Sequence, residues 1–294
     1  MKLDQVGFLT IAQNTNQTNY LDLAYLQAMS IKLVMPEYSY AVIVDKFTAN
    51  LIENKHLNYF NHVIELEKDC SESDSNKFEN EWQIFNLSPF KETIKLESDI
   101  LITRSIAHWI NTFRLRDVVL SLGCKNYMGD KASSRQYRKF FDDNLLPDIY
   151  NGLMYFRYSK TAFDFFQLAE KIFSNWKYIY ANVLKNCRQQ YVSTDVVYAL
   201  AAQILGIEQC TIPSADFINF VHMKPAINEW PNQPWHEIVS VELDLPMIRI
   251  ANVNQYYPLH YHEKSFINDS ILKEYENVLA RRINESGTTN LQSP

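Results

Sequence analysis

Glycine is scarce in this sequence, and with it the loops that usually hold nucleotide phosphates. Only six glycines occur among 294 residues, and neither G-x-G-x-x-G nor G-x-x-x-x-G-K-[ST] is present. Classical dinucleotide binding and P-loop phosphate binding are therefore disfavoured. The cysteines are also few and lack the short spacings typical of zinc sites, so we interpret them as free thiols in a reducing compartment; they are Cys70, Cys124, Cys187 and Cys210.

Long apolar runs and an excess of positive charge are missing as well. No run approaches the roughly 20 apolar residues that a membrane helix needs, and the apolar stretch in MKLDQVGFLTIAQ is too short for a signal peptide. We therefore expect a soluble cytoplasmic protein with no membrane span. The formal net charge of −6 is unlike that of proteins that hold nucleic acid by its phosphates. A hydrophobic content of 47% predicts a folded protein with a sizeable core.

Strands and helices are predicted to alternate in the first third of the chain. VGFLTIA (6–12), YAVIVD (40–45) and HVIEL (62–66) read as strands, and YLDLAYLQAMSIK (20–32) and residues 48–57 read as helices. CSESDSNKFENE (70–81) reads as a solvated loop, and NEWQIFNLSPFKE (80–92) as a helix leading into the strand TIKLESDILI (93–102). This alternation predicts an α/β fold with a mostly parallel central sheet flanked by helices.

The remainder of the chain is predicted to complete the same domain. RDVVLSL (116–122), DIYNGLMYFR (148–157) and FINFVHM (217–223) read as strands. Apolar spacing predicts one long helix over 161–184, a capped helix over 193–206 and a C-terminal helix over 270–283. No internal repeat or linker is apparent, so we predict one domain over residues 1–285 and a flexible tail over 286–294.

The strand TIKLESDILI carries two acids, Glu97 and Asp99, in an otherwise apolar run. A buried unpaired charge is costly, so the pair needs a partner, a solvated cleft or a metal ion. Residues two apart face the same side of a strand, and carboxylate oxygens are the ligands that Mg²⁺ and Mn²⁺ prefer. A salt bridge to Lys95 or Arg104 is the structural alternative, and the acid pair alone leaves both open.

Four segments, taken in order, resemble the GT-A glycosyltransferases, which use nucleotide sugars, and most closely the family-8-like retaining members. GFLTIAQNTNQTNYLDLAYLQAMSIK (7–32) is similar to their first strand and helix, and KETIKLESDILI (91–102) to their DxD strand. DIYNGLMYFR (148–157) and STDVVYAL (193–200) are similar to later motifs, and FVHMKP (220–225) is a candidate for the later histidine segment. The chain departs from the pattern where Glu97 replaces the first aspartate and where only Asp195 remains of a D-Q-D motif.

The resemblance implies a GT-A-like (Rossmann-like) fold and transfer of a sugar, most readily from a UDP-sugar. A Mn²⁺ or Mg²⁺ ion would stabilise the charge on the departing diphosphate, bound by Asp99, Glu97 and His222. The resemblance assigns binding of the donor to Ala12, Gln13, Asn14, Asp45, Glu97, Gly152 and Lys224. It assigns catalytic contacts with the sugar or the acceptor to Asn151 and Asp195. His260 and His262, with Lys264 as the phosphate cation, are rivals to His222, and Asp45 is alternatively a helix N-cap.

Two other functions fit the same fold. One is a non-catalytic GT-A-like module that binds a nucleotide sugar or a protein. The other is a nucleotidyltransferase, although AQNTNQTN (12–19) lacks the glycine and basic residues that hold a triphosphate. The acceptor is left open between glycans, lipids, proteins and, as for phage-type enzymes, modified DNA bases. The basic segment KASSRQYRK (131–139) keeps a polyanionic acceptor in consideration.

Overall fold

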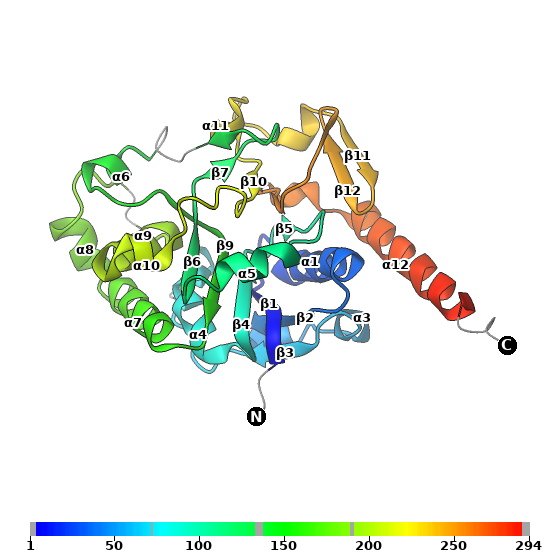
Figure 1. The fold of residues 1–294 in the computed structure, drawn as a ribbon, viewed down its shortest axis with the longest axis horizontal. Helices are drawn as coiled ribbons and strands as arrows, with labels where there is room; N and C mark the ends of the chain where they lie inside the picture. Colours follow the sequence, from blue (N-terminus) through cyan, green and yellow to red (C-terminus); the bar gives the residue numbers. More distant parts are fainter. Residues whose placement is uncertain (1–3, 72, 133–137, 189–190, 290–294) are drawn as a thin grey trace.

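A six-stranded sheet forms the centre of the molecule in the computed structural model, which describes residues 4–71, 73–132, 138–188 and 191–289 (Figure 1). Its strands, in spatial order, are β3 (His62–Glu65), β2 (Ser39–Val44), β1 (Asp4–Ala12), β4 (Phe90–Leu96), β9 (Ile149–Arg157) and β6 (Val118–Leu122). The pairs β1–β2, β1–β4 and β2–β3 are parallel, and β9 runs antiparallel to β4 and β6. The predicted α/β class with a mostly parallel sheet is confirmed.

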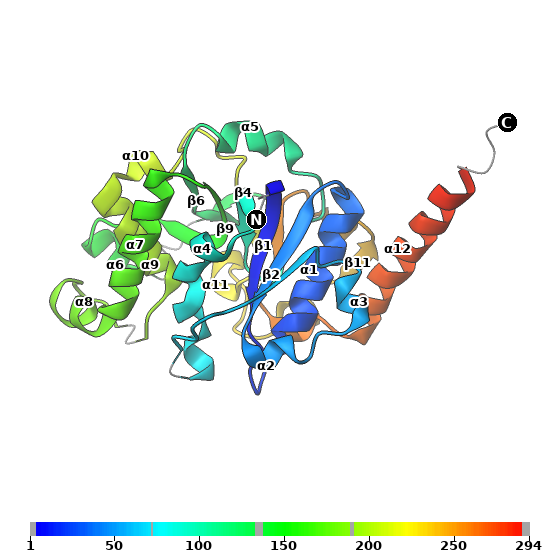
Figure 2. The same cartoon turned by 90° about the horizontal axis from the view of Figure 1, so that it is seen from below.

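Both faces of this sheet are buried under helices. Successive residues of a strand point to opposite sides, so each strand contributes to two hydrophobic clusters. In β1, Phe8 joins one hydrophobic cluster and Leu9 the other. Helices α1 (Tyr20–Val34) and α12 (Asp269–Thr289) contribute to the cluster of Phe8, whereas α7 (Lys160–Ser174) and α9 (Thr194–Leu205) contribute to that of Leu9. Figure 2 shows these two helix pairs on opposite sides of the strands. This arrangement leaves the strand ends free to build a site.

Two smaller sheets extend the fold. The first follows the end of β4 and contains, in order, β5 (Ile100–Leu101), β14 (Leu259–His260), β10 (Val221–His222), β7 (Cys124–Lys125) and β8 (Lys131–Ala132). The second is an antiparallel meander of β11 (Val241–Asp244), β12 (Met247–Ile250) and β13 (Val253–Asn254). The first of these sheets brings segments from the last third of the chain to the carboxyl end of β4.

The remaining helices are short and connect these elements. They are α2 (Lys46–Ala49), α3 (Asn54–Leu57), α4 (Ile84–Leu87), α5 (Ile110–Phe113), α6 (Phe140–Asp143), α8 (Trp176–Asn182), α10 (Ile207–Cys210) and α11 (Pro225–Asn228). The 3₁₀ helices are η1 (Asp74–Gln83), η2 (Ala107–Trp109), η4 (Trp235–Glu237) and η5 (Lys264–Phe266). Within the described ranges, no helix has both the length and the apolar character needed to cross a membrane.

Several predicted elements differ from the observed ones. The single helix expected over 161–184 is split into α7 and α8 at Asn175, whose side-chain Nδ2 donates to the carbonyl of Lys171 at 2.8 Å and so closes the last turn of α7. The helix expected over 48–57 is two short helices, α2 and α3. The loop expected over 70–81 largely forms η1, and the helix expected over 80–92 is reduced to α4.

The differences toward the C-terminus are of the same kind. The strand expected over 217–223 is limited to Val221 and His222 in β10. Helix α12 continues to Thr289, so residues 286–289 of the expected flexible tail are helical, and 290–294 lie outside the described residues. In the basic segment, residues 133–137, Arg135 among them, also lie outside the described residues.

Candidate functional site

The acid pair lies in a tight turn at the carboxyl end of β4 and not within the strand. The backbone N–H of Ile100 donates to the carbonyl of Glu97 at 3.1 Å and closes the turn. Gln27 of α1 is fully buried, and its side-chain Nε2 donates to the carbonyls of Glu97 at 2.6 Å and Ile100 at 2.8 Å. The hydroxyl of Tyr40 donates to Gln27 Oε1 at 3.0 Å and fixes the orientation of the amide. A helix side chain therefore holds the acidic turn in place.

An imidazole and an ammonium group, those of His260 and Lys264, contact Asp99, whose side chain is 5% exposed. His260 Nε2 lies 2.9 Å from Asp99 Oδ2, and the ammonium of Lys264 donates to the same oxygen. Burial opposes ionisation of Asp99, but His260 and Lys264 outweigh it and hold the pKa of Asp99 well below its ordinary value. The pKa of Lys264 is raised by Asp99 against the effect of burial. The site therefore combines a carboxylate with a ready counter-charge.

The second acid, Glu97, faces the same histidine. Its Oε2 lies 3.4 Å from His260 Nε2. Desolvation raises the pKa of Glu97, against the opposing charges of His260 and Lys95. The ligand atoms of Glu97, Asp99 and His260 all lie within 4.8 Å of one another. Two oxygen donors and one imidazole nitrogen therefore converge at the edge where the sequence predicted a metal.

Three histidines gather beside the acidic turn. His222 and His260 occupy matched positions on the parallel strands β10 and β14, and their rings stack with centroids 4.4 Å apart at an angle of 5°. His262 follows with a φ of 60°, a left-handed backbone that is uncommon outside glycine. Burial lowers the pKa of His222 well below its ordinary value and that of His262 to about 3. Both rings are therefore neutral near pH 7.

The histidine at hydrogen-bonding distance from Asp99 is His260. The sequence resemblance favoured His222 and kept His260 as a rival. Within the described residues, His222 has no hydrogen bond or ion pair with Asp99 and instead stacks on His260. The reason lies in β14, which pairs antiparallel with β5 directly after the acidic turn and so places His260 opposite Ile100.

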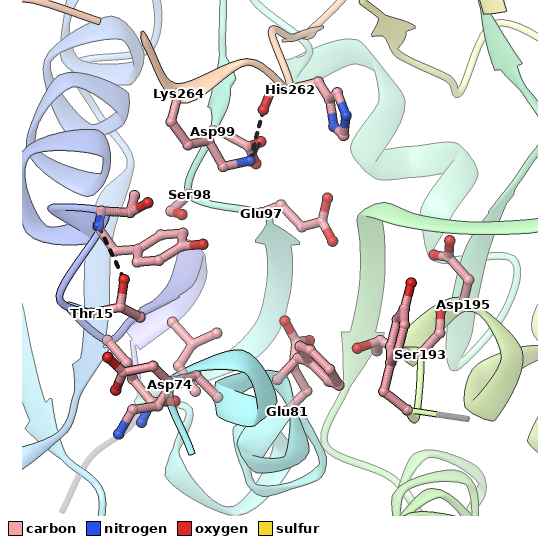
Figure 3. Close-up of a pocket in the computed structure, with 18 of the residues that line it drawn as sticks. Thr15, Asp74, Glu81, Glu97, Ser98, Asp99, Ser193, Asp195, His262 and Lys264 are labelled. Atoms are coloured by element: carbon pink, nitrogen blue, oxygen red, sulfur yellow. Dashed lines mark hydrogen bonds and ion pairs between the residues drawn. The ribbon is translucent and has the colours of Figure 1, made fainter. Parts of the chain in front are cut away.

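A cavity of about 840 Å³ opens over this edge of the sheet. Six of the predicted site residues line it, namely Gln13, Glu97, Asp99, Asp195, His222 and Lys224, as do His260, His262 and Lys264. Figure 3 shows Lys264, Asp99 and His262 on one side, Thr15 and Asp74 on a second, and Ser193 and Asp195 on a third, with Glu97 between them. The volume is within the range of small-molecule sites.

Three predicted donor-binding residues lie behind the cavity wall. Ala12 ends β1 and is fully buried. Asn14 Oδ1 accepts from the backbone N–H of Leu21 at 2.8 Å, so this side chain supports the start of α1. Asp45 caps α2 by accepting from the backbone N–H of Thr48 at 2.8 Å, and it forms an ion pair with Lys77 at 3.1 Å. The helix-cap interpretation of Asp45 is therefore the one that the contacts support.

Gln13 lines the cavity, but its amide is already engaged. Its Nε2 donates to Asp45 Oδ2 at 3.4 Å, and its Oε1 accepts from Asn80 Nδ2 at 3.1 Å. The neighbouring turn is also organised internally, since Thr15 Oγ1 accepts from the backbone N–H of Thr18 at 3.0 Å. Thr15 and Thr18 belong to the lining as well. This wall is a polar surface, but the Gln13 amide has little remaining capacity to form hydrogen bonds with a ligand.

Gly152 and Asn151 of β9 support the site from below. A Cβ on Gly152 would lie 2.6 Å from Cζ of Phe220, so the group that approaches this glycine closely is Phe220. The Phe220 ring packs in turn against His222 and His260, with centroids 6.2 and 5.8 Å apart. Asn151 is not among the residues that line the cavity, but its backbone N–H donates to Asp195 Oδ1, which does line it, at 2.7 Å.

Asp195 belongs to a small charged wall. Arg138 Nη1 donates to Asp195 Oδ2 at 2.7 Å, and the guanidinium lies over the rings of Phe141 and Tyr150 at 4.2 and 4.6 Å. Arg138 is thus committed to this wall, although the sequence placed it in an exposed basic loop. Burial, followed by the charge of Arg138, lowers the pKa of nearby Lys224.

Sequence reasoning missed the roles of three residues at the site, one of which, Lys95, was considered only as a partner of Glu97 and Asp99. Gln27 was read only as part of an apolar helix, and Glu81 as part of a solvated acidic loop, yet Glu81 is 5% exposed and lines the cavity. Its partner is Lys95, a fully buried lysine in β4, at 2.9 Å. The available signal was Lys95 itself, because a lysine within a buried strand requires an acidic partner nearby.

No family model matches this chain, and no curated protein matches it. Among solved structures, it is similar to mouse xyloside xylosyltransferase 1 (10% identity, 71% of this chain and 84% of the other, TM-score 0.44). It is similar to the galactosyltransferase LgtC, solved with donor and acceptor sugar analogues (13% identity, 66% and 70%, TM-score 0.42). It is also similar to the glycosyltransferase PaToxG (11% identity, 69% and 68%, TM-score 0.41). These similarities concern the outline of the fold.

Proposed function

We propose that this protein is a metal-dependent glycosyltransferase that moves a sugar from a nucleoside-diphosphate sugar, and specifically from a UDP-sugar. The observation that carries the proposal is the convergence of Glu97, Asp99 and His260, with ligand atoms within 4.8 Å of one another. They meet at the carboxyl end of a parallel strand, where open α/β sheets bind their ligands. This geometry adds to the resemblance of the sequence motifs to GT-A enzymes.

A divalent cation suits the donor set of this site. Carboxylate oxygens and one imidazole match the ligand preferences of Mn²⁺, and Asp99 already accepts from a cationic group, Lys264. Lys264 Nζ also donates to the carbonyl of His262 at 2.9 Å. Lys264 would therefore keep a hydrogen-bond acceptor if Asp99 coordinated a metal ion. When bound, the ion would act as a Lewis acid toward the diphosphate. Asp99, Glu97 and His260 would hold it.

Different residues of the cavity would then bind different parts of the nucleotide sugar. Lys264 would turn its ammonium toward the diphosphate, and Lys224, on the same cavity, would add a second positive charge. The wall around Thr15 and Thr18 would enclose the nucleoside. Asp195, fixed by Arg138 and by the backbone of Asn151, would orient hydroxyl groups of the sugar or of the acceptor.

Binding of the donor can be tested by thermal unfolding of the full chain. We would compare UDP-glucose, UDP-galactose, UDP-N-acetylglucosamine, UDP-xylose and GDP-mannose, each with and without MnCl₂. A ligand at about 100 times its Kd stabilises by about 2.7 kcal/mol, which corresponds to a rise in Tm of roughly 5 °C for a chain of this size. We expect that rise from a UDP-sugar only when Mn²⁺ is present, together with slow release of UDP.

The decisive variant is Asp99→Asn. We expect it to fold at a reduced Tm, because Asn keeps the size of the side chain and Lys264 keeps its bond to the carbonyl of His262, whereas the ion pairs of Asp99 with His260 and Lys264 are lost. We also expect it to lose the Mn²⁺-dependent shift and the UDP release. Asp216→Asn is the matched control, since Asp216 pairs with Lys131 on the surface and its side chain is 69% exposed. Unfolding of Asp99→Asn would show that Asp99 serves a structural salt bridge, and a Mn²⁺-independent shift would contradict the metal-dependent mechanism.

A further inference from the structure

A fully buried lysine lies directly beneath the candidate site. Lys95 is in β4, two residues before Glu97, and is 0% exposed. Its ammonium forms an ion pair with Glu81 Oε2 at 2.9 Å and donates to the carbonyl of Asn151 at 3.4 Å. Glu81 comes from η1, outside the sheet, and lines the cavity, whereas Lys95 does not. The pair therefore presents a carboxylate to the cavity and keeps its counter-ion behind the wall.

Stability alone does not account for this pair. Removing two charges from water costs several kcal/mol per ion, and replacing a buried ion pair by apolar residues of similar size is often neutral or stabilising. A buried pair that faces a ligand cavity is instead a way to hold one carboxylate in a fixed position. Asn151 adds to this, because its Nδ2 donates to Glu81 Oε2 at 3.2 Å.

The two acids that Asn151 contacts face one region of the cavity. Its backbone N–H donates to Asp195 and its side chain to Glu81, so the same residue sets both carboxylates. Figure 3 shows Glu81 beside Ser193 and across Glu97 from Asp99 and Lys264. If a diphosphate is held at Asp99 and Lys264, Glu81 lies on the opposite side of Glu97, and the sugar of the donor would extend toward it (Figure 3).

A neighbouring hydroxyl stays neutral beside this carboxylate. Burial, followed by the charges of Glu81 and Glu97, raises the pKa of Tyr198 well above its ordinary value. Tyr198 is fully buried in α9. The Tyr198 hydroxyl therefore adds no negative charge to this part of the wall.

We infer that Glu81 is a catalytic carboxylate that contacts the transferred sugar, with Lys95 as its positioning residue. The inference rests on the proposed function. As the bond from the anomeric carbon to the diphosphate oxygen breaks, its electron pair leaves with the diphosphate and the sugar ring gains positive charge. Glu81 stabilises that charge. The acceptor oxygen then bonds to the anomeric carbon, and its proton passes to the departing diphosphate.

The test measures UDP release in water, where water is the acceptor, with Mn²⁺ and the nucleotide sugar that shifts Tm most. Glu81→Gln keeps the shape and an acceptor for Asn151 but removes the charge. We expect kcat to fall about 100-fold or more, as when a single electrostatic group is removed from other active sites, with the Kd for UDP within about threefold. Glu37→Gln is the control, because Glu37 is exposed in the turn between α1 and β2.

The double variant Glu81→Gln/Lys95→Met separates catalysis from structure. It removes both charges of the buried pair, so we expect it to fold with a Tm near that of the unchanged protein and to remain as slow as Glu81→Gln. A double variant that folds and regains activity would show that the pair is only structural, and one that cannot fold would show that the fold needs it. Either result overturns the inference.

The single variant and the unchanged protein complete the set of outcomes. Full activity of Glu81→Gln would overturn the role of Glu81 alone, because the unchanged protein would still be an active transferase. Absence of UDP release by the unchanged protein, with every donor, would reject the proposed function and this inference with it.

Discussion

Replacing Gln27 by Met tests whether a buried helix side chain holds the acidic turn. Met has nearly the same length but cannot donate a hydrogen bond, so the carbonyls of Glu97 and Ile100 lose donors that lie at 2.6 and 2.8 Å. Tyr40 loses its contact to the amide but keeps the carbonyl of Ala24 at 3.2 Å. The change therefore isolates the two bonds to the turn.

The expected loss of stability follows from those two carbonyls. A buried polar group left without a partner costs about 1–3 kcal/mol. Ile100 is fully buried, whereas the bond to Glu97 is partly exposed to solvent, so the second carbonyl recovers part of its cost from water. We expect the free energy of unfolding to fall by about 2–4 kcal/mol, a large share of the 5–15 kcal/mol typical of folded domains.

The turn carries the proposed metal ligands, so Gln27→Met should also weaken Mn²⁺ binding. Groups that orient metal ligands typically contribute a factor of about 10–100 in affinity. Urea unfolding followed by tryptophan fluorescence measures the first effect, and calorimetric titration with MnCl₂ under native conditions measures the second. Gln167→Met on α7 is the matched control, because the hydrogen bond found for that side chain is a 3.4 Å contact to Glu170. A change below about 0.5 kcal/mol for Gln27→Met would refute this reasoning.

Three further outcomes can be checked independently. In calorimetric titration with MnCl₂, His260→Ala removes a proposed ligand and should weaken binding at least as much as the loss of an orienting group, about 10- to 100-fold, and His222→Ala should weaken it much less; the reverse order would assign the ligand to His222. Gly152→Ala places a Cβ 2.6 Å from Phe220 and should lower stability by about 1–3 kcal/mol in thermal unfolding, so an unchanged Tm would mean that the ring can move aside. Burial lowers the pKa of His56 below 6.5, so the unfolded chain binds a proton that the folded chain does not, and stability should fall as pH drops below about 6.5, by up to about 1.4 kcal/mol per pH unit. His56→Phe should reduce that slope in urea unfolding measured between pH 7 and pH 5, and an equal slope in both proteins would contradict this assignment.

The central sheet could be predicted because each of its strands is a short apolar run that can be recognised from its own residues alone. The break between α7 and α8 could not, since Ile172, Trp176 and Ile179 continue the helical apolar spacing across it. Asn175 ends α7 through a side-chain bond to the backbone, an alternative that hydrophobic periodicity does not report. Likewise, η1 was read as a loop because its most buried side chains, those of Asn80, Glu81 and Gln83, are polar.

The acids and the set of candidate histidines could be predicted from the sequence, but the choice between His222 and His260 could not. Glu97 and Asp99 stand next to a strand whose end any parallel sheet exposes. His260 reaches Asp99 from 161 positions away, through the pairing of two-residue strands that leave almost no pattern in sequence. Since His222 and His260 occupy matched positions on neighbouring strands, only the antiparallel pairing of β14 with β5 decides which ring meets the carboxylate.

The separation of these halves along the chain has a consequence for synthesis. Asp99 leaves the ribosome 161 residues before His260, which at 5–20 residues per second is an interval of roughly 8–32 s. During that time the acidic turn has neither its imidazole nor the ammonium of Lys264. β4 and β1 can pair early, whereas the sheet that contains β5 waits for β14, whose two residues come from the last fifth of the chain. The nascent chain therefore carries a pair of carboxylates without these partners, and this edge of the sheet can close only after β14 has been synthesised.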